Sequence, residues 1–586
     1  MYRARTARVK YFGETSETLV PSPLNGEPSS SLKIKCGRFP CSGIPFPGQL
    51  STSQQSSSSA ANKMDSKDLN TVEHVERKTT PMSEDSSHDA AIAFPKPSLW
   101  SKNSLKLYTC LAVGYLVSTM NGYDGSLMGA VNDMEQYQKS FGMNGKGSST
   151  GIVFIIYNLG QIAAFPFCGW LADGYGRRWA IFIGCVIVVI GAAVQTPANT
   201  MGQFQAGRFI LGFGASIAGA AAPTYTVEIS HPAYRGTQAG LYNVCWYLGS
   251  IIASWCCVGS NRHMHNSWAW RTPTVVQAAV PGIVAILVLF LPESPRWLIS
   301  QDRNEEAIAI LAKYHGEGDR NSSVVQIEYQ EMTEQISSSS SSSDKMWWNY
   351  KDLFNTRAAR YRIGLVIAMA FFGQWSGNNV VSYYMPTMFA QTGIESSDTR
   401  LVLNGIYPIF CMFAAIWGAT LLDRLGRRNM LIGATSFTVI CFAIITAGTA
   451  VSSSNKSASY AVIVFIYLFG MAFSWAYTPL QALYSAEVLE TKTRAKGSGL
   501  NFLFLNIAMC VNTFAAPVAM EKIGWRYYLV FVGWNCFEVF VIWKWFVETS
   551  GHTLEQLTEI FESPNPVKKS LEKRVVIVDE KGGNEV

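Results

Sequence analysis

A few charged side chains stand inside long uncharged stretches of this chain, and they are its clearest candidates for chemistry. Asp124 ends one stretch, in Asn121-Gly-Tyr123-Asp124-Gly-Ser, and Arg208 opens another directly after Gly207. If these stretches lie in a bilayer, a carboxylate there is costly unless it is paired or functional. We therefore expect Asp124 and Arg208 to be partners, either as a functional pair or as a permanent structural ion pair near the outer membrane edge.

A second group of charges occurs twice. The sequence Leu171-Ala-Asp173-Gly-Tyr-Gly176-Arg177-Arg178 recurs 250 residues later (423 minus 173) as Leu421-Leu-Asp423-Arg-Leu-Gly426-Arg427-Arg428. Similarly, Glu228 and Glu487 each precede an arginine, Arg235 and Arg494, by seven residues. Arginine offers five donors in a planar fork that suits a carboxylate. The repeat predicts ion pairs that hold helices together in one state and release them in another; arginines that only anchor the topology are the alternative.

The composition excludes an ordinary soluble enzyme. Of the 586 residues, 48% are hydrophobic and only 15% are charged, whereas soluble domains average about 25% charged residues. Because about 20 apolar residues span a bilayer as a helix, we interpret each long uncharged stretch as a span. The stretches form two groups of six: Leu107–Tyr123, Gly147–Ala172, Trp179–Gly207, Phe209–Val227, Gly236–Asn261 and Thr272–Pro292, then one from Ile363, Leu401–Leu422, Asn429–Asn455, Ser457–Ala486, Gly497–Met520 and Trp525–Phe546.

The sequence thus predicts an all-α membrane protein with twelve transmembrane helices in two six-helix, pseudo-repeated halves. The expected parts are a serine-rich, disordered N-terminus (1–104), a first half (105–292), a connector with short helices such as Asn304–Tyr314 (293–362), a second half (363–547) and a tail with one short helix near Leu554–Phe561 (548–586). No signal peptide is expected before the first span. The arginine-rich loops should face the cytoplasm, which places both termini and the connector there.

No cofactor or metal site is expected. Ten of the twelve cysteines lie between Cys110 and Cys536 without a C-x-x-C pair, and we interpret them as small apolar residues. The sequence has no nucleotide-binding loop or nucleophile elbow that would indicate an enzyme. The net charge of +6 does not indicate a nucleic-acid partner.

The repeat, together with Pro292-Glu293-Ser294-Pro295-Arg296-Trp297 after span six and Glu548-Thr-Ser-Gly551-His-Thr553-Leu554 after span twelve, resembles the sugar porter family of the major facilitator superfamily over residues 105–562. The resemblance implies two related halves that enclose a site at the membrane midplane and rock about it. Glu293 and Arg296 then join the repeated charges in a cytoplasmic gate. Pro223-Thr-Tyr-Thr-Val-Glu228 and Thr478-Pro479-Leu-Gln481-Ala482-Leu-Tyr484 resemble the fungal branch that contains lactose permeases and cellodextrin transporters.

The same resemblance implies a role for the first two charges. Proton-coupled members of the family have an acid and an arginine that match Asp124 and Arg208. Protonation of Asp124 would then weaken its pairing with Arg208 and favour the conformational step.

Span seven carries the predicted sugar site. It reads Gly373-Gln374-Trp375-Ser-Gly377-Asn378-Asn379-Val-Val-Ser-Tyr383-Tyr384 and is similar to the family pattern of two glutamines, a glycine, an asparagine and two tyrosines, except that Gly373 replaces the first glutamine. Sugar hydroxyls donate and accept hydrogen bonds, so amides suit them. We expect Gln374, Asn378 and Asn379 to bind the sugar and Trp375 and Tyr383 to form its wall; polar contacts between helices are the alternative for the amides.

Three positions predict a large site. Asn243 stands where many hexose porters of the family have glutamine, and Ala482 and Asn506 stand where they have tryptophan. The smaller side chains favour a disaccharide or glycoside over a hexose. Gln481 is a further candidate whose direction depends on helical register.

The expected function is import of a sugar such as lactose or cellobiose by proton symport with alternating access. The expected partners are the sugar, the proton and the lipid bilayer, in a monomeric unit in the plasma membrane. An uncoupled sugar facilitator, a transporter-like sugar sensor and an exporter of a small metabolite are the alternatives.

Overall fold

The computed structural model describes residues 100–143, 148–338, 350–452, 455–490, 493–552 and 554–572. The predicted serine-rich N-terminus therefore lies almost wholly outside the described residues, and so does the end of the C-terminal tail. Within the described ranges the regular structure is entirely helical, as the sequence predicted. The helices of the first half are α2 (Lys102–Val131), α3 (Glu135–Phe141), α4 (Ser148–Gly174), α5 (Arg177–Gln195), α6 (Met201–Ile229), α7 (Arg235–His263), α8 (Trp268–Val276) and α9 (Ala279–Val288).

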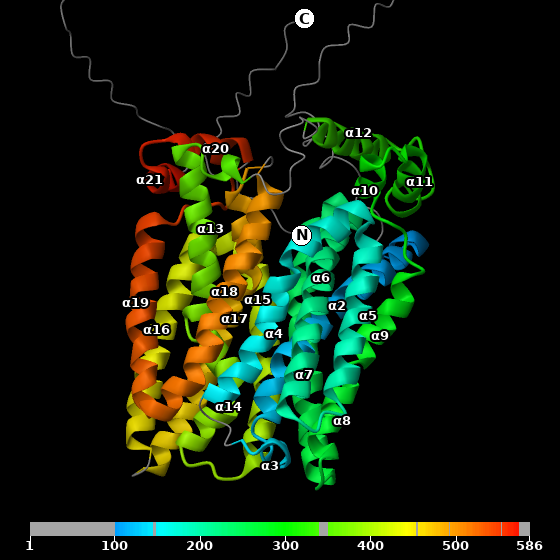
Figure 1. Cartoon of the computed structure of the whole chain (residues 1–586). Coiled ribbons are helices and arrows are strands. Elements are labelled where there is room, and N and C mark those ends of the chain that lie inside the picture. Colours follow the sequence, from blue (N-terminus) through cyan, green and yellow to red (C-terminus); the bar gives the residue numbers. More distant parts are fainter. Residues whose placement is uncertain are drawn as a thin grey trace, which may run out of the picture. The chain divides into compact units, whose positions relative to one another are not determined.

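Short helices separate this half from the next one. The connector contains α10 (Pro295–Ser300), α11 (Asn304–Tyr314) and α12 (Ser323–Ser338). The later helices are α13 (Arg357–Trp375), α14 (Asn378–Gln391), α15 (Ser397–Leu425), α16 (Arg427–Val451), α17 (Lys456–Val488), α18 (Arg494–Lys522), α19 (Tyr527–Trp545), α20 (Leu554–Glu562) and α21 (Pro566–Leu571). The helices α10 to α12 lie at the same end of the bundle as α20 and α21 (Figure 1).

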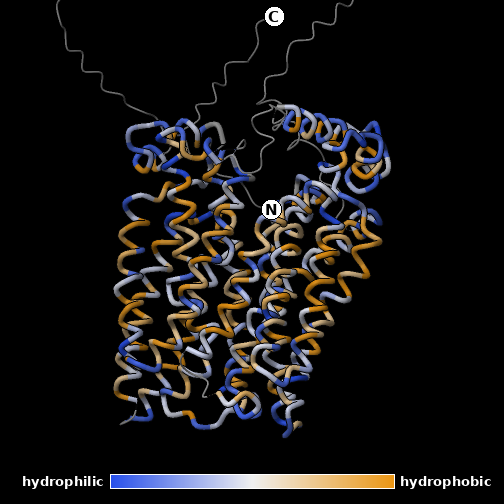
Figure 2. Tube along the Cα trace, in the orientation of Figure 1, coloured by the Kyte–Doolittle hydropathy of each residue, from blue (hydrophilic) through white to orange (hydrophobic). Residues whose placement is uncertain are grey.

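Nine segments of the described chain are long and apolar enough to cross a membrane, with α8 and α9 counted as one. The other three predicted spans correspond to α2, to α13 with α14, and to α19, and each of these carries charged or strongly polar side chains. Apolar residues follow the middle of the long helices, and hydrophilic ones gather toward the ends and over α10 to α12 (Figure 2). This distribution suits a bundle that buries its backbone hydrogen bonds in lipid.

The two halves contact each other mainly through three pairs of helices, with a smaller contact between α7 and α17. The helix α7 packs on α15, α4 packs on α18 and α2 packs on α14, while the more extensive contacts, such as α5 with α6 and α16 with α17, lie within a half. Each half is therefore held together more tightly than the halves are held to each other.

Span seven is a broken helix, which divides at Ser376 and Gly377 between α13 and α14. Span six is interrupted at Gln277 and Ala278 between α8 and α9, but both residues keep right-handed helical backbone angles, so the span continues from Trp268 to Val288. Gly377 has a φ of 107°, a left-handed conformation that glycine adopts at little cost. Broken helices in transporters commonly mark the binding site.

The predicted ends of three spans were wrong, because the prediction used charges as boundaries. The helix α2 continues past Asp124 to Val131. The break between α5 and α6 falls at 196–200, where Thr200 caps α6 with its side chain, so Arg208 lies inside α6 rather than at the start of a span. Asp124 and Arg208 are thus both within helices, where an unneeded charge would be costly.

Candidate functional site

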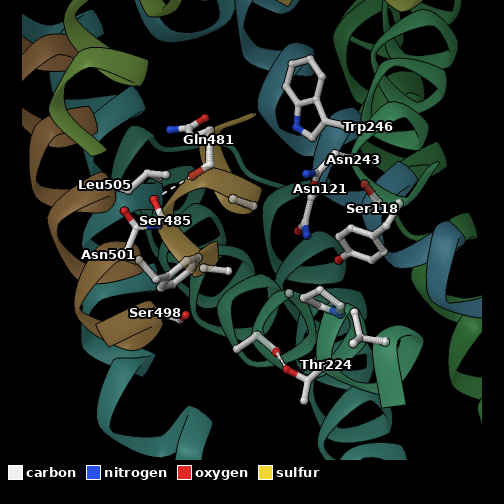
Figure 3. Close-up of a pocket in the computed structure, with 18 of the residues that line it drawn as sticks. Ser118, Asn121, Thr224, Asn243, Trp246, Gln481, Ser485, Ser498, Asn501 and Leu505 are labelled. Carbon is white, nitrogen blue, oxygen red and sulfur yellow. Dashed lines mark hydrogen bonds between the residues drawn. The ribbon is translucent and has the colours of Figure 1, made fainter. Parts of the chain in front are cut away.

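A cavity of about 2320 Å³ opens between the two halves. Side chains of α2, α4, α6 and α7 line it on one side, those of α13, α14, α15, α17 and α18 line it on the other, and it extends to α12. In Figure 3, Ser118, Asn121, Asn243 and Trp246 of the first half face Gln481, Ser485 and Asn501 of the second across this space. Both halves therefore contribute to one site.

Seven of the eight predicted substrate residues line the cavity: Asn243, Gln374, Asn378, Asn379, Tyr383, Gln481 and Asn506. Several are held in place by hydrogen bonds. Asn379 Nδ2 donates to Gln374 Oε1 at 2.9 Å, and Asn506 Nδ2 donates to the carbonyl of Phe502 at 2.9 Å. The break after α13 therefore presents a pair of mutually oriented amides to the cavity.

Trp375 is the exception. Its indole Nε1 donates to the carbonyl of Ala508 at 2.9 Å, and its ring packs on Phe371 and Trp534 with centroids 4.9 and 5.1 Å away. Successive helical residues point about 100° apart, so when Gln374 faces the cavity its neighbour faces α18 and α19. The prediction that Trp375 forms the wall of the site was wrong.

Gln481 occupies the space that Gly373 leaves. A Cβ atom at Gly373 would lie 2.8 Å from Gln481 Cδ, so a glutamine at that position, as in the family pattern, would require the side chain of Gln481 to move aside. Gln481 Nε2 is buried and has no hydrogen-bond partner in the described part of the chain. The amide missing from α13 is thus supplied from α17.

Several cavity residues were missed by the sequence analysis. Ser118, Asn121 and Gly125 of α2 line the cavity, as do Trp246 of α7 and Asn501 of α18. The α2 residues recur at a spacing of three and four, so a polar stripe in an otherwise apolar helix was the available signal. No comparable pattern marks Trp246.

The charges that line the cavity gather at one end. Its basic lining residues in the described chain, apart from His231, are Arg177, Arg235, Arg296, Arg494 and Lys496, and its acidic ones are Asp173, Glu228, Glu328, Glu331 and Glu334. All of them belong to helix ends or connector helices on the side of α10 to α12. The part of the lining near Gln374 and Asn243 carries amides, hydroxyls and aromatic rings.

Asp124 and Arg208 lie behind the cavity wall. Asp124 is 0% exposed and Arg208 is 2% exposed. The carboxylate accepts a hydrogen bond from Gln277 Nε2 at 2.5 Å, while the guanidinium lies 4.7 Å from the ring centroid of Tyr157. Arg208 Nε and Nη1 have no hydrogen-bond partner among the described residues. The arginine is near enough for its charge to act on Asp124, yet no ion pair joins the two side chains in this conformation.

The repeated charges form two equivalent clusters, one in each half. Arg177 Nε and Nη2 donate to Glu228 at 3.0 and 3.2 Å, and Arg427 donates in the same way to Glu487 at 3.3 and 3.0 Å. A hydroxyl completes each cluster at 2.6 Å, from Ser294 to Glu228 and from Thr549 to Glu487.

A further acid caps the arginine helix in each cluster. The backbone N–H of Arg178 donates to Glu293 at 3.2 Å, and that of Arg428 donates to Glu548 at 3.1 Å. The sequence motifs indicated a gate role for Glu293 but not for its equivalent Glu548, although both precede a hydroxyl residue. These contacts join helices of the same half, so they do not close the cavity.

The other predicted gate residues differ in exposure and in partners. Asp173 is exposed and pairs with Arg177 at 3.2 Å. Arg235 pairs with Glu328 of the connector helix α12 at 3.0 Å, and Glu328 also contacts His315 Nδ1 at 2.6 Å. Burial raises the pKa of Glu328, but the nearby charges of His315 and Arg235 outweigh it and hold that pKa below its usual range.

Arg296 and Arg494 line the cavity from opposite halves. Arg494 Nη2 donates to the carbonyl of Leu489 at 3.4 Å, and burial together with the charge of Arg296 lowers the pKa of Arg494. The side chain of Asp423 lies outside the described part of the structure.

At the opposite end, ion pairs link the halves. Asp133, just after α2, pairs with Arg400 of α15 at 2.9 Å, and Arg262 of α7 pairs with Asp398 at 2.6 Å. The cavity therefore opens toward the connector, and contacts between the halves lie at the other end.

Comparison with known proteins agrees with this architecture. The family described as "Sugar (and other) transporter" matches residues 110–561. The chain is 29% identical over 463 residues to the MFS-type transporter criB of Aspergillus cristatus, covering 79% of this chain and 95% of that one. It is 25% identical to a probable quinate permease of Aspergillus flavus, covering 78% and 88%, and 28% identical to a high-affinity glucose transporter of Kluyveromyces lactis, covering 81% and 90%.

A solved structure shows the same fold. The xylose transporter XylE from E. coli, in a partially occluded inward open conformation, superposes with a TM-score of 0.64 at 20% sequence identity, covering 76% of this chain and 99% of that one. The family match extends over most of the chain and both halves of the bundle. The chain therefore belongs to the sugar porter family of the major facilitator superfamily, and it is a multi-pass membrane transporter rather than an enzyme.

Proposed function

We propose that this protein imports a neutral sugar, with a disaccharide such as lactose or cellobiose as substrate, and that a proton moves inward with it. One observation carries the proposal: the amide-lined part of the cavity, away from the charges at the connector end, lies against a buried acid and arginine. Tyr157 connects the cavity with the charged pair. Its side chain lines the cavity, and the guanidinium carbon of Arg208 lies 4.7 Å from the centroid of its ring.

The absence of charge at the middle of the cavity supports a neutral substrate. An acidic substrate such as quinate would be held by a cation, since a desolvated carboxylate needs a charged or multiple hydrogen-bonding partner. The arginines and the lysine of the described lining all lie at the connector end. Gln374, Asn379 and Gln481 instead offer neutral donors and acceptors, which suit hydroxyl groups.

The size of the lining residues supports more than one sugar ring. Ala482, Asn243 and Asn506 all line the cavity, and each is smaller than its counterpart in hexose porters. Trp246 provides an aromatic face from the opposite half, on which the C–H face of a sugar ring can pack. Together with the motifs in α6 and α17, these residues support assignment to the branch of fungal lactose permeases and cellodextrin transporters.

Coupling follows from the position of Tyr157. When Asp124 binds a proton its attraction for Arg208 falls, and the guanidinium rests on the ring of Tyr157, as in this conformation. When Asp124 loses the proton to the open side, it attracts Arg208 again and Tyr157 is released. A sugar that contacts Tyr157 thereby senses the protonation of an acid that it does not touch.

The topology belongs to the same proposal. The connector end carries the repeated arginines, so the positive-inside rule assigns it to the cytoplasm and makes the present conformation open to the inside. We assign the protein to the plasma membrane as a monomeric transport unit, with halves 105–292 and 363–547 rocking about the cavity.

Uptake by proteoliposomes tests the proposal. Labelled lactose or cellobiose should accumulate when an inward proton gradient is imposed, and unlabelled disaccharide should compete better than glucose, xylose or quinate. Uptake that only equilibrates and ignores pH and voltage would establish a facilitator instead. Better competition by quinate or by a hexose would overturn the substrate assignment alone.

A further inference from the structure

We infer that Gln277 is the positioning residue that links the protonation of Asp124 to span six, at the junction of α8 and α9. The inference rests on the proposed proton symport and adds to it a residue that neither the sequence motifs nor the repeat indicates. Gln277 is 1% exposed and directly follows α8. Its Nε2 is the hydrogen-bond donor to Asp124, at 2.5 Å.

An amide suits this position because it can serve both forms of the acid. Its N–H donates to a carboxylate, and its carbonyl oxygen accepts from a protonated carboxyl group. Gln277 Oε1 and Asp124 Oδ2 have no hydrogen-bond partner in the present arrangement, so rotation of the amide can exchange one bond for the other. Arginine donates only, and a second carboxylate would repel the first. Gln277 can therefore hold the acid through a complete proton cycle.

A second contact joins the same two elements. Tyr123, the neighbour of Asp124, donates its hydroxyl to the carbonyl of Pro273 in α8 at 2.8 Å. The N–H of Gln277 also bonds to that carbonyl. Two adjacent residues of α2 thus form hydrogen bonds to the last turn of α8. A change in the protonation of Asp124 therefore acts first on the junction of α8 and α9 in span six.

Other charged and titratable groups near Asp124 contribute less specifically. They are Arg208 of α6, Tyr157 of α4, Cys185 of α5 and Tyr383 of α14, together with Cys256 and Cys257 of α7, which face Tyr123. Among the described residues, only Gln277 forms a hydrogen bond with the carboxylate. It is therefore the side chain whose loss changes the proton affinity of the acid without removing a charge.

The test compares pH profiles of disaccharide uptake in proteoliposomes. In Q277L the carboxylate loses its donor, so Asp124 holds its proton more tightly and the pH of half-maximal uptake rises by about one unit. Q277E is nearly isosteric and adds a like charge, so the midpoint rises further. Q238L, which removes another buried glutamine of the first half, should keep the wild-type midpoint. Counterflow exchange measures correct folding for each variant.

Infrared difference spectra provide an independent readout. A carboxyl C=O band that disappears in D124N should shift in Q277L and stay in place in Q238L. A wild-type midpoint and an unshifted band in Q277L, with pH-driven uptake intact, would overturn the role of Gln277 while leaving proton symport standing. Wild-type uptake that is independent of pH would overturn both.

Discussion

Asp124 and Arg208 are both buried in the first half, yet they do not form an ion pair. Asp124 contacts Gln277, and Arg208 lies on Tyr157 at 4.7 Å. A charge inside a membrane helix is costly, so an arginine held by an aromatic face rather than by a carboxylate is in a state that can change. We therefore expect the pair to separate and rejoin during transport.

Replacing Asp124 with asparagine should uncouple transport. D124N keeps the shape of the acid but cannot lose a proton, so sugar accumulation should fall to simple equilibration while counterflow exchange continues. Labelled disaccharide uptake with and without a proton gradient measures both. D319N, at an exposed aspartate between α11 and α12, is the matched control. Accumulation by D124N at the wild-type level would show that another group carries the proton.

Substitutions at Gly373 and Gln481 should affect disaccharide binding non-additively. Because a Cβ atom at Gly373 would lie 2.8 Å from Gln481 Cδ, G373A should displace the amide and weaken disaccharide binding. Q481A should weaken it by about tenfold, the value of one hydrogen bond. The double variant G373A/Q481A should match Q481A alone, since residues that share one contact are not additive. Competition binding measures all three, and additive losses would contradict the arrangement.

At the scale of elements, the junction of α8 and α9 lies beside Asp124, and the break between α13 and α14 lies beside the cavity. The first presents Gln277 to the acid, and the second presents Gln374 and Asn379 to the cavity. The clusters at Arg177 and Arg427 fix the neighbouring helices within a half. Movement is therefore expected at these two positions and between the halves rather than inside either cluster.

Lowering the pH on the side of the membrane where Asp133 lies should weaken the ion pair between Asp133 and Arg400, which links the halves. Burial raises the pKa of Asp133, and the hydrogen bonds and charge of Arg400 and the hydroxyl of Ser397 oppose this shift only in part. The pair with Arg400 is intact above the pKa of Asp133 and is lost as the pH falls through it, at a higher pH than for an exposed aspartate. External acid therefore favours opening to the outside.

D133N should reproduce this effect at neutral pH. A cysteine at Ser118 in the cavity, with the exposed Cys536 replaced by alanine, should react several times faster with an impermeant maleimide added outside. D398N removes the more exposed ion pair to Arg262 and should have a smaller effect, because exposed pairs contribute about 0.2–1 kcal/mol. Equal rates in D133N and wild type would mean that Asp133 does not hold the outer contact.

At the scale of the whole molecule, the cavity opens at one end while ion pairs join the halves at the other. Such an arrangement gives access from one side at a time. We expect transport to proceed by exchanging the closed end for the open one, and the looser packing between halves than within them favours this exchange.

Labelling from the two sides should reveal this asymmetry. Ser485 lines the cavity, so S485C in a background without Cys36, Cys41 and Cys536 should react quickly with an impermeant maleimide in inside-out vesicles and slowly in right-side-out ones. Disaccharide should protect the cysteine. Faster labelling in right-side-out vesicles would reverse the topology assigned to the connector.

The sequence by itself determined the class of fold, the repeat and seven of the amide and aromatic residues that line the cavity. Uncharged stretches indicate segments whose backbone is buried in lipid, and this signal lies within short segments of sequence. The helix Asn304–Tyr314 and the charged motifs at Arg177 and Arg427 also depend on short segments, so they could be predicted as well. The residues of span seven carried enough pattern to select Gln374 and Asn379.

Only the tertiary structure decided which side chains meet. Asp124 and its partner Gln277 are 153 positions apart, and no spacing rule connects them. Trp375 faces away from the cavity while Trp246 faces into it, because a step of one residue turns a helical side chain by about 100°. The positions of the charges in the sequence indicated which residues are functional candidates. What those residues contact depends on the register of each helix and on the junctions of α8 with α9 and of α13 with α14.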